Sequence, residues 1–484
     1  TLLLATLFCT WAAAAAQTGP AINSYSAGAG GAGPSAADSS ASMQQEAQQN
    51  PFFGGAPPGP AQPGVMQLSL NDAIRLGLKY NLGILMSGQA TRQARGARIR
   101  ALSKLLPQIS AGASESSQQI NLKAFGFAGF SGQSPIVGPF SVFDVRGYID
   151  QPILDLEDLH KARAESDNVK AARYTYQNAR DLVVLVSANL YLQAISGSSR
   201  VDAAKAEVKT SQAVYDRAVD LKKAGMVPGI DVLRSQVELQ AQQQRLIYLE
   251  NQFQTEKLDL ARAIGLPMAQ EFRLTDQVPY APPPSITLDQ ALTRALATRA
   301  DYKSLLAQVH AAESLKKAAR SEALPSLDFH ADYGDIGSSP GNSHGTYTVA
   351  ASVKVPLFQG GKVRGDVMQA DAVLRQRQSE LKDLQNKIQY QVRTAILNLK
   401  SSEDQVHVAT STQDLAHQQL TQARDRFAAG VVNSLEVVQA QEAVATADEN
   451  YISSLYRYNV AKASLARALG LAEETFRQMT GGSK

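Results

Sequence analysis

Six histidines, one cysteine and one glycine-rich segment with a lysine are the parts of this chain with the types of residue that support chemistry. The histidines, at positions 160, 310, 330, 344, 407 and 417, show no metal-binding spacing such as H-E-x-x-H. The Gly360-Gly361-Lys362 segment lacks the upstream glycine and the following Ser or Thr of a phosphate-binding loop. The single cysteine, Cys9, excludes an intramolecular disulfide and a cysteine-built metal site. We therefore expect no enzyme, no metal site and no cofactor, and we expect solvent-facing histidines.

Two acidic residues, Asp231 and Glu436, follow turns of matched sequence. The turn Ala224-Gly225-Met226-Val227 reappears as Ala429-Gly430-Val431-Val432, and each acid then begins a new helical pattern. Carboxylates are favourable at helix N-termini because of the helix dipole. Each acid could therefore be a solvated residue that stabilises the start of a helix, and a functional role is the alternative.

The matched turns belong to a longer internal repeat. The segment Leu70–Pro107 reappears as Leu288–Pro325 at one constant spacing, and Ala263–Leu266 reappears as Ala468–Leu471. A repeat unit of about 200 residues is too long for a solenoid, so it favours a duplicated half-protein.

Composition favours long helices over a bulky globular core. Aromatic residues make up 6% of the chain, and the hydrophobic fraction owes much to alanine, which suits helices that pack closely on small side chains. Charge is nearly balanced, with 47 basic and 44 acidic residues, so the sequence does not favour a nucleic-acid partner.

The N-terminus is typical of an exported protein. Thr1–Trp11 is an apolar run, and Ala12–Ala16 provides an Ala-x-Ala cleavage site before Gln17. We expect residues 1–16 to be a partial signal peptide that carries Cys9. Residues 17–65, rich in Gly, Ala, Pro and Gln, are expected to be a disordered leader, because they cannot bury enough apolar area to offset the entropy of ordering.

Two stretches predict exceptionally long helices. No proline occurs between Pro152 and Pro228, and none occurs after Pro356. Apolar residues step by three and four along both stretches, as in a coiled-coil seam, at 169, 172, 176, 179, 183, 186 and 190 in the first. A helix of such length runs on the order of 100 Å. Seam-like spacing also follows each turn, at Ile230, Leu233 and Val237 in the first half, so each half is predicted to contain an antiparallel helical hairpin.

Four segments alternate apolar and polar residues with period two, at 109–114, 143–150, 327–334 and 347–355. The pattern fits either half-buried strands of a soluble sheet or strands of a transmembrane barrel. The export signal, strand lengths near the ~10 residues that cross a bilayer, and the lack of an apolar stretch long enough for a transmembrane helix favour the barrel. Four strands cannot close a barrel and open edges are not viable in lipid, so several chains must combine.

Several motifs recur in order in both halves: Val355-Pro356-Leu357-Phe358-Gln359-Gly360-Gly361 and its weaker counterpart Asp150-Gln151-Pro152-Ile153, Arg426–Gly430 followed by Glu436–Gln441, and the Gly225 turn followed by Asp231-Val232-Leu233. By the order and spacing of these motifs the chain resembles, from about Met66 to Leu471, the outer membrane efflux protein family, the TolC-like channels.

This resemblance implies a mixed fold: a long antiparallel α-helical coiled-coil barrel plus a transmembrane β-barrel, with four strands per chain and twelve in a homotrimer. It implies an outer-membrane channel-tunnel in contact with outer-membrane lipid, its helical part in the periplasm. Its expected partners are a periplasmic adaptor (membrane fusion protein) and an inner-membrane transporter, as in tripartite efflux or type I secretion. The alternative is a soluble periplasmic coiled-coil adaptor or structural protein.

The resemblance also assigns residues. The adaptor-docking tips match Gly225, Met226, Val227, Gly430, Val431 and Val432. The pore constriction matches Glu436 and Gln439, with Asp231 in the associated network. Strand-to-helix junctions match Pro152, Pro356, Gly360 and Gly361. The best-known members have two acidic residues where this chain has Glu436 and Gln439, and a tip arginine where it has Val432, so we expect one acidic ring rather than two and an absent or rebuilt closing latch.

The expected organisation follows from the repeat. Residues 66–281 form the first repeat and 282–475 the second, each with a short helix, two strands and a long helical hairpin, and residues 476–484 form a C-terminal tail.

Overall fold

The computed structural model describes residues 50–126, 135–276, 280, 282, 286–429, 431–432 and 434–474. All of them belong to Asn50–Lys484, the second of two units into which the chain divides. The predicted signal peptide with Cys9, residues 17–49 of the predicted leader, Gly430 and the predicted tail 476–484 lie outside the described residues.

Two sets of elements follow each other in the same order: two helices, two strands and two longer helices. The first set is α2 (Leu70–Tyr80), α3 (Leu82–Ser103), β2 (Gln108–Asn121), β3 (Ile136–Leu154), α4 (Leu156–Lys223) and α5 (Gly229–Ile264). The second set is α6 (Leu288–Thr298), α7 (Ala300–Ser321), β5 (Ser326–Gly337), β6 (Ser343–Lys354), α8 (Lys362–Ala428) and α9 (Ser434–Ala468). The smaller elements are β1 (Met66–Leu68), which pairs in parallel with β4 (Phe272–Leu274), and the 3-10 helices η1 (Pro51–Phe53), η2 (Leu122–Phe125) and η3 (Pro340–Asn342).

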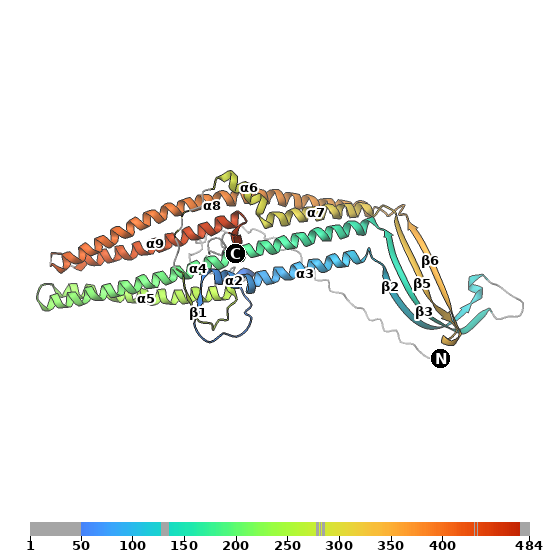
Figure 1. Cartoon of the computed structure of the whole chain (residues 1–484), viewed down its shortest axis with the longest axis horizontal. Coiled ribbons are helices and arrows are strands. Elements are labelled where there is room, and N and C mark those ends of the chain that lie inside the picture. The colour runs from blue at the N-terminus through green and yellow to red at the C-terminus, as the bar shows by residue number, and fades with distance from the viewer. Residues whose placement is uncertain are drawn as a thin grey trace, which may run out of the picture. The chain divides into compact units, whose positions relative to one another are not determined.

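The two long helices predicted from the sequence are α4 and α8. They contain 68 and 67 residues, so each is on the order of 100 Å long at ~1.5 Å per residue. Each packs against the helix that follows its turn, α4 against α5 and α8 against α9, with the turns at one end and the four-stranded sheet at the other (Figure 1). The predicted antiparallel hairpins are confirmed.

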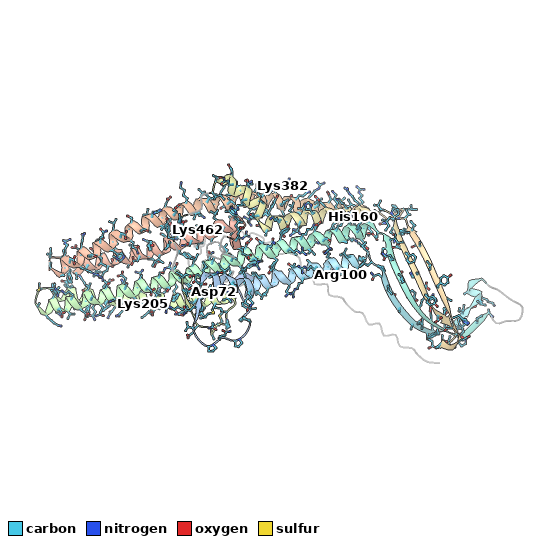
Figure 2. The ribbon with its side chains drawn as sticks, viewed as in Figure 1. Asp72, Arg100, His160, Lys205, Lys382 and Lys462 are labelled. Atoms are coloured by element: carbon cyan, nitrogen blue, oxygen red, sulfur yellow. The ribbon has the colours of Figure 1, made fainter. Side chains whose placement is uncertain are left out.

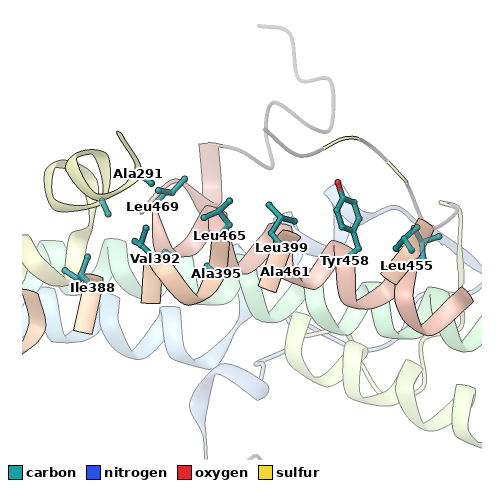
Figure 3. Packing of buried hydrophobic residues seen from close by; sticks show 13 residues of the cluster. Ala291, Ile388, Val392, Ala395, Leu399, Leu455, Tyr458, Ala461, Leu465 and Leu469 are labelled. Carbon is teal, nitrogen blue, oxygen red and sulfur yellow. The ribbon is translucent and has the colours of Figure 1, made fainter. Parts of the chain in front are cut away.

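Small and branched side chains fill the space between these helices. Figure 3 shows one such cluster, in which α8 meets α9 and α6. Its labelled members are Ala291, Ile388, Val392, Ala395, Leu399, Leu455, Tyr458, Ala461, Leu465 and Leu469. Tyr458 is fully buried and its ring centroid lies 5.4 Å from that of Tyr280. Burial raises the pKa of Tyr458 to about 12, so the phenol stays neutral at physiological pH.

The apolar residues that were predicted to pack α5 against its hairpin partner lie on the exposed face of α5. Ile230, Leu233 and Val237 are exposed, each at 50% or more, whereas Leu239 and Leu249 of the same helix are buried. The spacing of the apolar residues is helical, as predicted, but α5 has two apolar faces and only one of them meets α4. The other face has no cover within the described part of this chain.

The sheet has the strand order β2-β3-β5-β6, and each neighbouring pair is antiparallel. Ile109 pairs with Ile149, Ile149 with Ala331, and Ala331 with Val349, so one apolar row crosses all four strands. The adjacent row, on the opposite face, is Ser110, Tyr148, Asp332 and Thr348. The predicted period-two alternation is confirmed, and among the described residues of a single chain β2 and β6 each keep one edge without a partner strand.

Charged side chains on the polar face are bonded across the strands. Arg146 pairs with Asp332 and donates from Nη2 to Thr346 Oγ1 at 2.9 Å, and Asp144 accepts from its Nε at 3.3 Å. His330 Nδ1 lies 2.6 Å from Asp150 Oδ1. These contacts link β3, β5 and β6, so the polar face is cross-linked even without a neighbouring chain.

The two strand-to-helix junctions are built differently. In the second half, Gly360 and Gly361 have φ of +59° and +87°, and Gly361 caps α8; these left-handed values favour glycine, as the predicted turn requires. In the first half, Pro152 is still within β3, and Asp155 caps α4 by accepting a hydrogen bond from the Asp158 N–H at 2.9 Å.

The last part of the predicted leader is ordered, in contrast to the expectation for residues 17–65. The Leu82 N–H donates to Gly54 O and the Ala56 N–H donates to Tyr80 O, both at 2.9 Å, and η1 packs against α3. Composition could not predict this ordered segment, because it is held by backbone hydrogen bonds, which leave no hydrophobic pattern in the sequence.

One correction concerns apolar length. The sequence predicted no apolar stretch long enough for a transmembrane helix, but among the described residues α4 is long and apolar enough by composition to cross a membrane. More than half of its apolar window, 56%, is buried inside the fold, as expected for a core helix.

Asn81 ties together three segments at the joint between α2 and α3. This fully buried side chain donates from Nδ2 to Phe52 O at 2.7 Å and to Ala263 O at 2.9 Å, and accepts from the Gly83 N–H at 2.9 Å.

We expect Asn81→Ala to lower the free energy of unfolding by about 3 kcal/mol, since each of three hydrogen bonds contributes about 1 kcal/mol. Unfolding of the detergent-solubilised protein measures this. The exposed Asn398→Ala is the control, and an equal loss in both variants would contradict the assignment.

Glu207 of α4 is a buried acid between the two hairpins, and its Oε2 has no hydrogen-bond partner. Burial and, next, the charge of Asp448 raise its pKa, against the opposing charges of Arg245, Arg424 and His417. The folded state therefore binds a proton here more tightly than the unfolded state, and stability falls as pH rises from the ordinary glutamate pKa through the folded value.

Replacing this acid should remove that pH dependence. We expect Glu207→Gln to raise the free energy of unfolding by about 1 kcal/mol at about pH 8 and to change it little at about pH 4, where the wild-type acid is protonated. Denaturant titrations at both pH values measure the difference. Glu442→Gln, an exposed change on α9, should shift neither value, and a pH-independent effect of Glu207→Gln would rule out the explanation.

Candidate functional site at the helical turns

The two long helices end with the same type of backbone hydrogen bond. At the end of α4 the Met226 N–H donates to Leu221 O at 2.9 Å, and at the end of α8 the Val431 N–H donates to Arg426 O at 3.0 Å. Such bonds, which reach back five residues, are typical of helix ends closed by a left-handed glycine, and Gly225 has a φ of +69°. The matched sequences thus form matched turns, with Gly430 outside the described residues.

Each turn presents one apolar side chain to solvent and folds another inward. Met226 and Val431 are 61% and 69% exposed. Val227 and Val432, the next residues, pack with Val232 on a buried cluster that includes Phe427. Of the residues predicted to dock an adaptor, the first of each pair is thus exposed, and the second packs on the buried cluster.

Asp231 connects the two hairpins. Its side chain is buried and accepts a hydrogen bond from Ser434 Oγ of α9 at 2.6 Å, and Arg234 Nη1 lies 3.6 Å from the same oxygen. A charge-assisted hydrogen bond at this length is stronger than a neutral one. Asp231 is thus not a solvated helix-start residue but a link between α5 and α9.

Glu436 and Gln439 lie three residues apart at the start of α9, so their side chains share one face of the helix. Gln439 is exposed. Glu436 is half-buried and accepts from Arg426 Nη1 at 2.7 Å, across the turn of its own hairpin. The acid expected to form a ring therefore has a cationic partner in the single chain.

The partners of the two acids, Arg426 and Ser434, were not predicted from the sequence. Arg426 belongs to the motif that precedes the second turn, and Ser434 begins the helix that follows it. A basic residue ten positions before Glu436, on the other arm of a predicted hairpin, could have suggested the first pair. Nothing in the sequence signals the pairing of Ser434 with Asp231, because it joins separate hairpins.

The histidines are dispersed over several elements and make separate contacts. His330 contacts Asp150 in the sheet, while His417 Nε2 lies 3.2 Å from Asp448 Oδ1 between α8 and α9. No group of three or more His, Cys, Asp or Glu side chains within the described ranges is arranged to hold a metal ion.

Comparison with known proteins identifies the family. The family model described as outer membrane efflux protein matches residues 81–266 and 291–471. The alkaline protease secretion protein AprF of Pseudomonas aeruginosa is 24% identical over 67% of this chain and 69% of its own length. The pyoverdine export outer membrane protein OpmQ of Pseudomonas putida is 24% identical over 83% of this chain and 85% of its own.

Solved structures share the fold. The Campylobacter jejuni CmeC outer membrane channel aligns with a TM-score of 0.72 at 18% identity, over 85% of this chain and 88% of that one. The outer membrane protein VceC from Vibrio cholerae aligns with a TM-score of 0.71 at 16% identity, over 83% and 96%. With both halves matched by the family model and the whole hairpin-and-sheet arrangement shared, this chain belongs to the outer membrane efflux protein family.

Proposed function

We propose that three copies of this chain form an outer-membrane channel-tunnel that conducts substrates from an inner-membrane transporter to the exterior. The observation that carries the proposal is the sheet, in which an apolar row crosses four strands and both edges are open. An outward apolar face and an inward polar face are what a transmembrane barrel requires.

Closure of the sheet is the first step of the argument. The unpaired backbone groups of β2 and β6 would each cost several kcal/mol in hydrocarbon. Pairing β6 of one chain with β2 of the next satisfies both edges, and three chains give a barrel of twelve strands. Family membership places the chain in the outer membrane, with its helical part in the periplasm.

Uncovered apolar faces on the helices support the trimer. On α5 the exposed face carries Ile230, Leu233, Val237, Ile247, Tyr248 and Leu258, and on α8 it carries Tyr390, Leu397, Val408 and Leu415. Exposed apolar stripes of this length mark interaction surfaces. The α5 face of one chain packing on the α8 face of its neighbour would bury both and close the helical tunnel.

The repeat accounts for the shape of one subunit. We assign residues 66–281 and 282–475 to two copies of one ancestral half, because both contain the same elements in the same order. Duplication gives each chain two hairpins with matched turns, so a trimer presents six tips around the tunnel entrance.

The tips are the proposed contact with a periplasmic adaptor. Met226 and Val431 expose apolar side chains on anchored turns, which is the form that a docking surface for another helical protein needs. Glu436 and Gln439 would face the tunnel axis just beyond the second tip, with Asp231 holding α5 to α9 beside them. Opening would separate the hairpins, and a partner that binds the open state better would favour it.

The cargo is set elsewhere in the assembly. One relative is named for secretion of an alkaline protease and another for export of pyoverdine. A conduit that serves such different molecules in related systems leaves selection to the inner-membrane partner, which we therefore propose as the element that chooses the substrate here.

A charge placed on the open face of α5 tests the trimer. We expect Val237→Glu to weaken association by about 2 kcal/mol or more per interface, because the interface would bury an unpaired carboxylate. Native mass spectrometry in detergent measures the oligomer. Gln93→Glu adds the same charge at an exposed position of α3, a helix that carries neither of the two proposed faces, and should leave the trimer intact; dissociation of both variants, or a monomeric wild type, counts against the interface.

Single-channel conductance in planar bilayers tests the conduit. We expect a small cation-preferring conductance whose preference falls in Glu436→Gln and rises in Arg426→Gln, because the second change frees the Glu436 carboxylate from its partner. Asp414→Asn removes an exposed acid farther up α8 and should leave the preference unchanged. A folded protein that forms no pore, and that is extracted without detergent, would favour the soluble coiled-coil adaptor instead.

A further inference from the structure

A pocket rich in arginine lies between α3 and α4, beside the start of α7 and the end of α9. Its volume is about 700 Å³. Arg92 and Arg95 line it from α3, Arg173, Tyr176 and Arg180 line it from α4, and Glu473 closes one side. The residues on each helix are spaced by three, four or seven positions, so each set shares one face and points to the same space.

One arginine of the pocket already binds a carboxylate in a forked geometry. Arg180 Nε lies 3.0 Å from Glu473 Oε2, and Arg180 Nη2 lies 2.8 Å from Oε1. Two parallel bonds of this kind are the strongest and most directional contact between a guanidinium and an oxyanion. Glu473 thus shows, inside the pocket, how an anionic group is held there.

The other three arginines have no such partner. Arg92 makes only a long contact of 3.5 Å to the Gln89 side chain, and neither it nor Arg95 nor Arg173 has an acidic partner among the residues that the structure describes. The pocket sets four arginines against two carboxylates, those of Glu473 and Asp181. It therefore carries an excess of positive charge in a concave site.

A fifth arginine lies next to the part of α4 that lines the pocket. Arg467 of α9 donates from Nη2 to Asn178 Oδ1 at 2.5 Å, while its Nε and Nη1 are buried with no hydrogen-bond partner. Its charge opposes the rise in pKa that burial causes at Asp181. Arg467 therefore offsets the charge of Asp181, one of the two carboxylates of the pocket.

We propose that this pocket binds a multiply charged anion that carries phosphate or carboxylate groups. Guanidinium groups match the planar geometry of these oxyanions, and the volume is that of a small-molecule site. Arg92, Arg95 and Arg173 supply the contacts, Arg180 orients the site through Glu473, and Tyr176 provides an aromatic wall. The site lies along α3 and α4, separate from the turns and the proposed constriction, so it adds to the channel function and does not depend on it.

Calorimetric titration of the detergent-purified full chain tests the site, with pyrophosphate and citrate as probes at equal ionic strength. We expect saturable binding of at least one probe, and the double variant Arg95→Ala/Arg173→Ala to bind it at least about tenfold more weakly. Arg100→Ala removes an exposed charge from the last turn of the same helix, α3, outside the pocket (Figure 2), and should bind as the wild type does. Preference for pyrophosphate or for citrate distinguishes phosphate-bearing from carboxylate-bearing ligands.

Absence of saturable binding by either probe, or an equal loss in Arg100→Ala, would overturn the proposal. A second measurement uses only the wild type and so does not depend on how the variant folds. Phenylglyoxal modifies accessible arginines, and mass spectrometry locates them; the bound probe should protect Arg95 and Arg173 and leave Arg100 reactive. If the probe left the reactivity of Arg95 and Arg173 unchanged, or lowered that of Arg100 equally, the site would also be rejected. Conductance of the same sample tests the channel separately.

Discussion

A helix of 68 residues cannot be stabilised from its ends, so the fold depends on side-chain packing along the whole of α4. Near the sheet α4 packs against α3 and α7, in its middle against α2, and toward the turn against α5 and α9. Alanine, glycine and serine at many of its buried positions permit these close approaches. Of the apolar window of α4 that would suit a membrane by composition, 56% is buried inside the fold.

The returning helices are held by side chains at two helix joints. Asn81, between α2 and α3, donates to Ala263 O in the last turn of α5. Arg299, between α6 and α7, donates to Ala468 O in the last turn of α9 at 3.5 Å and forks onto Asp301. The two halves solve the same problem with different chemistry, a neutral amide in one and a buried ion pair in the other.

Much of this architecture follows from sequence because its signals are periodic. The absence of proline and the steps of three and four predicted α4 and α8, and the period of two predicted the four strands with their faces. What sequence could not supply is the choice between two apolar faces. Ile230 and Val237 have the spacing of a seam, but nothing in the described part of this chain covers them, and the proposed trimer assigns them to contact with a neighbouring chain. Likewise, Asp155 replaces glycine as the cap at the first junction, which no pattern in the second half could foretell.

At the turns, too, the sequence predicted the backbone but not the partners of the side chains. Matched residues predicted matched backbones, as the bonds from Met226 and Val431 show. The partners of the acids did not follow, because Arg426 reaches Glu436 across a turn and Ser434 reaches Asp231 across a hairpin interface. Contacts between segments distant in sequence carry no periodic signal, and the arginine pocket between α3, α4 and α9 is of the same kind.

The open edges of the sheet also bear on biogenesis. Each chain brings two strands, β2 and β6, whose outer N–H and C=O groups find partners only on other chains in the proposed barrel. A lone subunit would meet the full cost of those groups on entering lipid, whereas its helices can associate in water first. Insertion and assembly would then be a single concerted event, initiated in the periplasm by the long hairpins and completed in the bilayer by the strands.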